Sequence, residues 1–425
     1  MTDRLAVEPA TESKDAQAHA VEAGLPLRAA KTRERLIAGV VAVLSEVGMG
    51  GITHRRVAAA AKVSLSATTY HYDTKNALVT DASKALLKRY LESFAHSAEI
   101  YRESKGSCNS LTGLAAQLAL NAVGLGRAES IAWCEIILDA ARTPDGHKLA
   151  SEWFGELAES WRAVAAAMGE KLSWEAIQAV SDTTIGLYFI ILALGLGEKQ
   201  VEALWLSDDP CKVWGIEANP NIAAEAEHRF GRKALETRSK IIGGAIRILN
   251  RDGAGAVTYR NVAAESGVAL TAPAYYFSSI DDLMRVAEGE LFRASKERYR
   301  AVAALSRSTE MTPAIIADMS ATILIKEATE FRLPSAAFYS LWLQAARSSA
   351  LRPEVAGMIV DQATAWQRRA AILEGISFQD GIFFQALFIG ILVRAMASGA
   401  PIEVLMETRA EFFEVLTHRR WPSLK

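Results

Sequence analysis

The sequence has little that a disulfide framework or a metal centre would need. Only three of its 425 residues are cysteine, namely Cys108, Cys134 and Cys211. They show no metal-ligand spacing and leave an odd number, so we expect reduced thiols, no metal and a cytoplasmic protein.

Targeting and membrane-spanning segments are lacking as well. The first thirty residues have neither the basic start nor the apolar run of a signal peptide, and their mixture of charged residues with Ala and Pro predicts a disordered tail. The most apolar stretches, 185–196 and 381–396, are shorter than the roughly 20 residues of a membrane span. We expect buried helices there and no membrane contact.

Sequence features of catalysis are missing. There is no glycine-rich phosphate loop and no nucleophile elbow, and the seven histidines are scattered along the chain. We therefore expect no enzyme activity, no catalytic residues and no cofactor.

Proline is scarce, with 11 residues, and Val/Thr-rich alternating runs are absent. Half of the residues are hydrophobic, and Ala is abundant. This composition predicts an all-α protein. The length fits about two to four domains better than a single core.

What the chain does contain is an internal repeat. Shifted by 205 positions, residues 32–78 align without a gap with residues 237–283. In each copy an amphipathic stretch ends at Gly48 or Gly253, which we expect to be the left-handed residue that terminates a helix. Thr53 and Thr258 follow at positions where they can cap the next short helix.

A third helix is expected at 64–72 and again at 269–277, after a tight turn. Two short helices joined by such a turn form a helix-turn-helix. Polar positions are repeated together with apolar ones, which a generic pair of packed helices would not require. Such a duplication indicates two equivalent contacts, as proteins use on two-fold related DNA sites.

The net charge of −2 hides an uneven distribution. Residues 31–90 contain ten Lys/Arg against four Asp/Glu, and residues 232–300 contain twelve against eight, which leaves the remainder near −12. Basic segments in an acidic chain are typical of polyanion binding. A solvated, charged helix face is the alternative explanation.

A fainter repeat continues beyond these segments. Arg142 corresponds to Arg347 and Trp161 to Trp366 at the same shift, and further matches follow at a shift of 204. We therefore expect a complete duplicated unit. The expected divisions are a disordered tail (1–30), a first helix-turn-helix domain (31–80), a first helical body (81–197), a loop linker (198–231), a second helix-turn-helix domain (232–285) and a second helical body (286–425).

These residues resemble the TetR-type family of transcriptional regulators. The family pattern is Thr-x-Arg-x-Val/Ile-Ala, a turn with Val, a recognition helix ending in Tyr/His-Phe, and Lys-x-x-Leu opening the fourth helix. The first copy carries it as Thr53, Arg55, Val57, Ala58, Val63, His71, Tyr72, Lys75 and Leu78. The second copy carries it as Thr258, Arg260, Val262, Ala263, Val268, Tyr276, Phe277 and Leu283.

The resemblance implies that each unit has a three-helix head and a helical body for effector binding and pairing. Family members usually act as homodimers, so this chain looks like both subunits fused into a monomeric pseudo-dimer. Its pairing helices are expected at 152–168 and 173–196, packed against 352–373 and 377–397 as a four-helix seam.

The resemblance also implies that the partner is a double-stranded DNA operator, with the recognition helix of each head in the major groove. The candidate DNA-binding residues of the first head are Thr53, His54, Arg55, Ser66, Ala67, Thr69, Tyr70, His71 and Lys75. Those of the second head are Thr258, Tyr259, Arg260, Thr271, Ala272, Tyr275 and Tyr276.

The two heads depart from the family pattern in different ways. Tyr70 and Tyr275 stand one place later than the usual tyrosine, and we expect them to be exposed, the alternative being a core position. The family's lysine is Lys75 in the first head but Ile280 in the second, which predicts weaker DNA binding there. Pro273 restricts the second recognition helix, because proline fits only near a helix start. Unlike reading surfaces predict an operator with two unlike half-sites.

Each body is expected to hold a small-molecule effector of unknown identity in a largely apolar cavity. Candidate lining residues are Trp133, Asp139, Arg142, Trp153 and Tyr188 in the first body, and Phe338, Trp342, Gln344, Arg347 and Phe384 in the second. Core packing is the alternative for each of them. Arg142 and Arg347 could instead pair across the seam or with internal carboxylates.

Together these features predict a ligand-responsive, DNA-binding transcriptional regulator that acts as a repressor. The alternative is a small-molecule sensor or protein-interaction module in which one DNA-binding head is weakened or lost. No residue distinguishes repression from activation.

Overall fold

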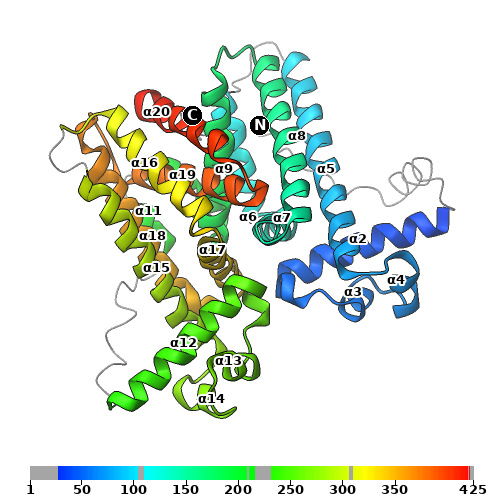
Figure 1. Ribbon diagram of the computed structural model, residues 1–425. Helices are drawn as coiled ribbons and strands as arrows, with labels where there is room; N and C mark the ends of the chain where they lie inside the picture. The colour runs from blue at the N-terminus through cyan, green and yellow to red at the C-terminus, as the bar shows by residue number, and fades with distance from the viewer. Residues whose placement is uncertain are drawn as a thin grey trace.

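The computed structural model describes residues 27–103, 110–207, 210–215, 231–305, 310–419 and 421, and all regular elements in these ranges are helices (Figure 1). The all-α prediction is confirmed. The N-terminal half contains α2 (Leu27–Val47), η1 (Met49–Gly51), α3 (His54–Ala60), α4 (Leu65–His71), α5 (Lys75–Glu103), α6 (Leu111–Val123), α7 (Arg127–Ala140), α8 (Pro144–Ala167) and α9 (Trp174–Ala193).

The C-terminal half repeats this order. It contains α12 (Arg232–Asp252), η3 (Ala254–Ala256), α13 (Tyr259–Ser266), α14 (Ala272–Tyr276), α15 (Ile280–Leu305), α16 (Pro313–Thr329), α17 (Arg332–Arg347), η4 (Ser349–Leu351), α18 (Arg352–Arg369), η5 (Ala370–Ile372), α19 (Phe378–Ser398) and α20 (Ile402–His418). In Figure 1 the heads, α2–α4 and α12–α14, lie at the lower side, and the other helices form the body above them.

Two segments differ from expectation. The helix α2 begins at Leu27, inside the expected tail, whose residues 1–26 lie outside the described residues. The expected loop linker contains α10 (Glu198–Leu206) and α11 (Pro210–Trp214) in its described part. Val201 and Leu204 of α10 are buried, and α10 packs against α6, so this segment forms helix because it covers apolar surface.

Local signals in the heads act as the sequence suggests. The Thr53 side chain caps α3 by accepting a hydrogen bond from the Arg56 amide (3.2 Å), and Thr258 caps α13 in the same way. Gly48 and Gly253 have φ of 81° and 80°, as expected for glycine. Their ψ values of −176° and 176° differ from a left-handed helical residue, because the chain leaves extended toward η1 and η3.

The third head helix differs between the halves. In the first head α4 spans almost all of the expected 64–72, whereas α14 begins only at Ala272, three residues later than the expected start at 269. Pro273 stands in the first turn of α14 and is buried. Because proline has no amide hydrogen and fixes φ, the helix cannot extend far before it.

The two halves pack together through α9 and α19, which share the most extensive helix-helix contact in the described chain. A Cβ atom at Gly186 would overlap the carbonyl of Ala386, and one at Gly390 would overlap the carbonyl of Asp182. These glycines therefore let two backbones approach directly. Helices α8 and α18 also contact α19, which gives the arrangement expected for the seam.

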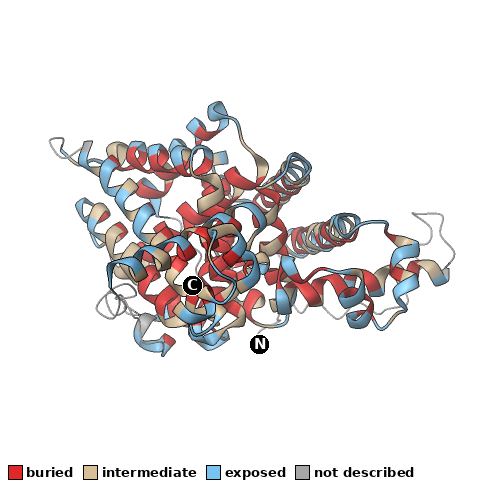
Figure 2. Cartoon of the chain, turned by 60° about the horizontal axis from the view of Figure 1, so that its bottom comes forward, coloured by how far each residue is buried: buried red, intermediate tan, exposed pale blue. Residues whose placement is uncertain are grey.

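Both seam helices lie close to the ranges expected from the sequence, 173–196 and 377–397. Helix α9 has 20 residues and α19 has 21, and both are long and apolar enough to cross a membrane. Their apolar windows are 100% and 89% buried inside the protein, which is the environment of core helices (Figure 2).

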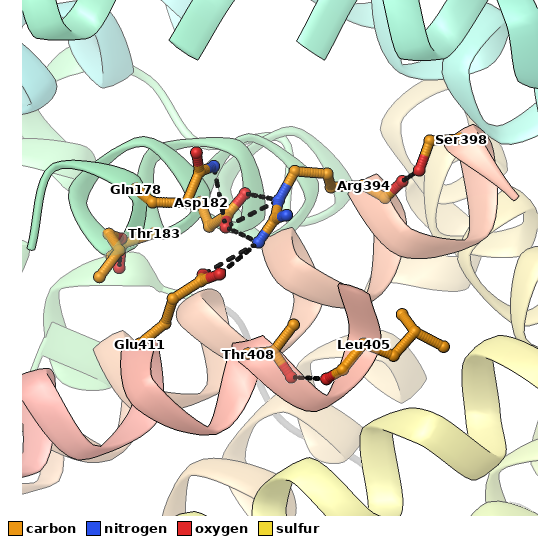
Figure 3. A network of polar contacts seen from close by, with 9 residues as sticks. Gln178, Asp182, Thr183, Arg394, Ser398, Leu405, Thr408 and Glu411 are labelled. Atoms are coloured by element: carbon orange, nitrogen blue, oxygen red, sulfur yellow. Dashed lines mark hydrogen bonds and ion pairs between the residues drawn. The ribbon is translucent and has the colours of Figure 1, made fainter. Parts of the chain in front are cut away.

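One ion cluster is buried in this seam (Figure 3). Arg394 of α19 donates to Asp182 of α9 (2.8 Å) and to Glu411 of α20 (2.8 Å), and Gln178 donates to Asp182 (3.3 Å). Burial raises the pKa of Glu411 to about 8, although Arg394 opposes this shift. One guanidinium thus faces two carboxylates across three helices.

Candidate nucleic-acid interface

Each head presents one large aromatic side chain to solvent from its third helix. Tyr70 on α4 is 84% exposed, and Tyr275 on α14 is 77% exposed. Tyr72 and Phe277, two positions later, are buried in the heads. The expected division between an exposed tyrosine and a core aromatic is therefore correct in both copies.

The buried aromatic residues are held differently in the two heads. The Tyr72 hydroxyl donates to Asp81, which also accepts from Arg33 (2.7 Å), so a polar network links α2, α4 and α5. In the second head Arg238, the counterpart of Arg33, lies over the Phe277 ring at 5.2 Å. A cation–π contact replaces the ion pair there.

Most residues predicted to touch DNA in the first head are exposed. The exposed ones are Thr53, Arg55, Ser66, Thr69, Tyr70 and Lys75. His54, Ala67 and His71 are partly buried, and His54 Nδ1 is buried without a hydrogen-bond partner among the described residues. Thr53 uses its hydroxyl oxygen as an acceptor for the α3 cap, which leaves the hydroxyl hydrogen free to donate.

In the second head fewer of the predicted DNA-contact residues are exposed. Its exposed candidates are Thr258, Arg260, Thr271 and Tyr275, whereas Ala272 and Tyr276 are partly buried. The Tyr259 hydroxyl donates to the Phe277 carbonyl (2.8 Å), so Tyr259 ties α13 to the end of α14. This internal bond occupies the Tyr259 hydroxyl, and the assignment of Tyr259 as a DNA contact stays a prediction.

Charge at the start of the fourth helix also differs. Lys75 is the exposed first residue of α5, whereas α15 starts with Ile280 followed by Asp281 and Asp282. Asp282 accepts hydrogen bonds from the Ser278 amide and hydroxyl. Arg285 also pairs with Asp282 (2.9 Å), and Ser348 donates to Asp281 (3.1 Å). The second head thus has two partnered carboxylates where the first head has an exposed lysine, a difference that the loss of the lysine alone did not reveal.

The heads touch each other at the turns η1 and η3. A Cβ atom at Gly50 would overlap the backbone of Gly255, and one at Gly255 would overlap Gly50. The backbones of the two heads are thus in direct contact, and the repeat itself places these two glycines at equivalent positions.

Arginines from the bodies hold the heads crosswise. Arg347, at the end of α17 in the second half, donates to the carbonyls of Leu44 (2.8 Å) and Ser45 (3.1 Å) in the first head and pairs with Glu135 (2.6 Å). Glu135 in turn accepts from the Met49 amide (3.0 Å). We call this set of contacts the Arg347 clamp.

Its counterpart is weaker. Arg142 of the first half donates to the Leu249 carbonyl of the second head (3.4 Å) and lies 3.5 Å from Asp139. Arg142, Asp139, Gln344 and Arg347 line the space between the heads and the body. None of the four lines the two aromatic cavities of the bodies, and the two arginines contact the opposite half, in line with the alternative that they pair across the halves.

The cavities of the two bodies lie elsewhere. A first cavity of about 30 Å³ is lined by Trp133, Trp153 and Tyr188, as expected, together with Tyr90, Phe94, Leu118, Leu157, Trp161, Ser181, Thr184 and Ile185. A second cavity of about 100 Å³ is lined by Phe292, Lys296, Tyr299, Arg300, Ile323, Asp361, Gln362, Ala365, Trp366, Arg369, Gln385 and Phe388.

The aromatic residues expected in the second cavity do not line it. Phe338 packs against Trp342 (5.5 Å between ring centroids), and Phe384 stacks on Trp366 (5.9 Å) from the core side. The sequence did hold a signal for the true lining, because Trp366 matches Trp161 at the repeat shift and both line their cavities. Among the described residues, no group of three or more His, Cys, Asp or Glu side chains could hold a metal ion.

Comparison with known proteins gives few matches. No family model matches the chain, and no curated protein matches it. A solved structure that it resembles is that of the multidrug binding protein EbrR complexed with imidazole, at 26% sequence identity and a TM-score of 0.36. The match covers 47% of this chain and 98% of the EbrR chain.

Proposed function

We propose that this chain is a TetR-type transcriptional regulator, formed by tandem duplication, that binds DNA through two helix-turn-helix heads in one polypeptide. The observation that carries the proposal is the exposed tyrosine on the third helix of each head, in segments that are basic within an acidic chain. A short helix with an exposed polar surface fits the major groove, and surrounding cations contact phosphates.

In the first head, Tyr70 and Ser66 would face base edges while Arg55 and Lys75 bind the backbone. The capped start of α3 adds backbone amides near the phosphates. In the second head, Tyr275 and Arg260 take the equivalent places on a shorter α14. Different side chains in the two grooves predict an operator with unlike half-sites.

Effector control would act through α5 and α15. Helix α5 starts at the exposed Lys75 of the first head and carries Tyr90 and Phe94 into the first cavity. Helix α15 connects Ile280 in the same way to residues of the second cavity. A ligand that displaces such a helix also displaces its head, and release of DNA on ligand binding makes the protein a ligand-responsive repressor.

Selection of binding sites from random duplex DNA by the full chain tests this proposal. We expect one chain per operator and two half-sites that differ in sequence, with affinity that falls steeply as salt rises. Tyr70→Ala and Tyr275→Ala should each weaken protection of a different half of the footprint, whereas Arg162→Ala on the exposed face of α8 should change neither half. A perfect palindrome, or two chains on each operator, would contradict the fused-dimer reading.

A second candidate function rests on Asp281 and Asp282. Their charges at the start of α15, with the short α14, favour a second head that has lost much of its DNA affinity. The protein would then read one half-site and use the second half to sense ligand. A footprint restricted to one half-site, unchanged by Tyr275→Ala, would favour this function.

A further inference from the structure

The two cavities occupy equivalent places in the repeat but differ in chemistry. Six lining positions correspond, as Phe94 with Tyr299, Leu118 with Ile323, Leu157 with Gln362, Trp161 with Trp366, Ser181 with Gln385 and Thr184 with Phe388. The position of Arg369 is occupied by Val164 in the first half. Charge and amide groups are therefore confined to the second cavity.

Arg369 is a cation with no anionic partner in the described part of the chain. Burial lowers its pKa, and no carboxylate among the described residues offsets this effect. Its guanidinium carbon lies 5.7 Å from the centre of the Trp366 ring, and no hydrogen bond joins it to another described residue. The side chain is half-buried, and a guanidinium with five donors and no carboxylate bound to it can pair with the carboxylate of a ligand.

A second polar group in the cavity lacks a partner. Gln385 is 1% exposed and donates to Gln362 (2.7 Å), but its Oε1 atom is buried without any hydrogen bond. An acceptor in this state needs an N–H or O–H group. The neighbouring Lys296 is already paired with Asp361 (2.6 Å), so that pair does not supply it.

Aromatic side chains form a large part of the remaining lining, beside Ile323, Ala365, Arg300 and the Lys296–Asp361 pair. Phe292, Trp366 and Phe388 face the cavity, whose volume of about 100 Å³ approaches that of the roughly 150 Å³ cavity that holds benzene in an engineered protein. The space is therefore on the scale of a single aromatic ring. The first cavity offers the unpartnered indole N–H of Trp133 and no cation.

We propose that the second cavity binds a small aromatic carboxylic acid bearing a hydroxyl or amino group, one molecule per chain. The carboxylate pairs with Arg369, the ring lies among Phe292, Trp366 and Phe388, and the ring substituent donates to Gln385 Oε1. The first cavity does not bind this class. Binding of the acid is measured without DNA and so does not depend on the proposed regulatory function. Only the effect of the acid on DNA binding rests on that function.

Calorimetric titration of the full chain tests the proposal, with benzoate, 2-hydroxybenzoate, 4-hydroxybenzoate and the neutral analogue 4-hydroxybenzamide as probes. We expect a hydroxybenzoate to bind with a stoichiometry of one and the neutral amide to bind at least about tenfold more weakly. Arg369→Met should remove this preference for the acid. Arg368→Met changes the exposed neighbour and should leave it intact.

Gln385→Leu tests the second contact, the hydrogen bond from the ring substituent to Gln385 Oε1. It should weaken the hydroxybenzoate to the level of benzoate and leave benzoate itself unchanged. Circular dichroism shows whether each variant is folded. If Arg369→Met is unfolded, Arg369→Lys, which keeps the positive charge, replaces it in the titrations. Equal affinity for acid and amide, two molecules per chain, or no saturable binding of any of the acids at millimolar concentration would overturn the proposal.

DNA binding without ligand distinguishes this outcome from failure of the regulatory function. Operator binding with no acid bound overturns only the ligand proposal. Acid binding by a protein that binds no DNA overturns only the proposed function.

Discussion

Removing the Arg347 clamp should release the first head and leave the second in place. Arg347→Met keeps the aliphatic length of the side chain but loses the bonds to Leu44, Ser45 and Glu135. The Arg347 and Glu135 side chains are only 9% and 12% exposed, so the ion pair is largely desolvated. The substitution leaves a buried carboxylate without its cation.

The expected cost follows from that burial. Loss of one partner from a buried pair costs about 3–5 kcal/mol, and the remaining hydrogen bond from Met49 to Glu135 places the value near 3 kcal/mol. Arg142→Met is the matched control, because its bonds are long and Asp139 is 42% exposed. It should cost about 1 kcal/mol or less.

Native-state hydrogen exchange measures the two heads separately. Arg347→Met should speed exchange of amides in residues 44–52 by about 100-fold, and those in 249–257 much less. Adding Glu135→Gln should recover part of the protection, because no buried charge is then left unpaired. Equal acceleration in both heads, or none in either, would refute the clamp.

Three further predictions concern the contacts between the halves. Gly50→Leu should push the heads apart at Gly255 and reduce operator affinity by at least about tenfold while leaving the bodies folded, as gel shift and thermal melting can show. Gly186→Val should lower the midpoint of urea unfolding, at a cost of about 3 kcal/mol or more, because its side chain would overlap the Ala386 carbonyl. The pKa of Glu411 is raised from 4.5 to about 8 in the folded state, so the folded protein holds this proton more tightly than the unfolded chain does. The resulting contribution to the free energy of unfolding is fully present below about pH 4.5 and is lost as pH rises toward 8. Glu411→Gln should therefore flatten the decline in the free energy of unfolding between these pH values.

Matched controls exist for each of these changes. Gly243→Ala adds a methyl group near only a flexible Arg247 side chain, and Gly155→Ala adds one where no atom lies within 4 Å. Both should be neutral or slightly stabilising. Glu407→Gln alters an exposed carboxylate of α20 and should leave the pH profile as in the parent. Normal operator affinity in Gly50→Leu, an unchanged urea midpoint in Gly186→Val, or an unaltered pH slope in Glu411→Gln would each contradict its prediction.

The heads could be read from the sequence because their signals are local. Thr53 and Thr258 each cap the helix that follows by accepting a hydrogen bond from the amide three residues later. The exposure of Tyr70 and Tyr275 follows from their spacing to the buried aromatic residue two positions later. The length of α14 was missed although Pro273 indicated it, since the repeat suggested equal helices. At this position the proline determines the length of the helix, although the two repeats align.

The contacts between distant segments could not be read in the same way. Arg347 lies about 300 positions from Ser45, and nothing near either residue indicates that a body of one half reaches the head of the other. The second cavity was missed because Phe338 and Phe384 have the composition of a lining but face the core. Only the correspondence of Trp161 with Trp366 indicated where the second cavity lies. Using it required the assumption that equivalent positions of the repeat line equivalent cavities.

The buried cluster of Asp182, Arg394 and Glu411 affects which halves can pair without leaving a buried charge uncompensated. In the repeat Arg394 corresponds to Ile190, and Asp182 corresponds to Ala386. Under the proposed duplication, a pair of two first halves would bury Asp182 without its arginine, at a cost of several kcal/mol per uncompensated ion. A pair of two second halves would keep the Arg394–Glu411 pair, which lies within one half, and would lose only the contact to Asp182. If the two halves were expressed as separate chains, the first half would therefore assemble with the second half rather than with itself.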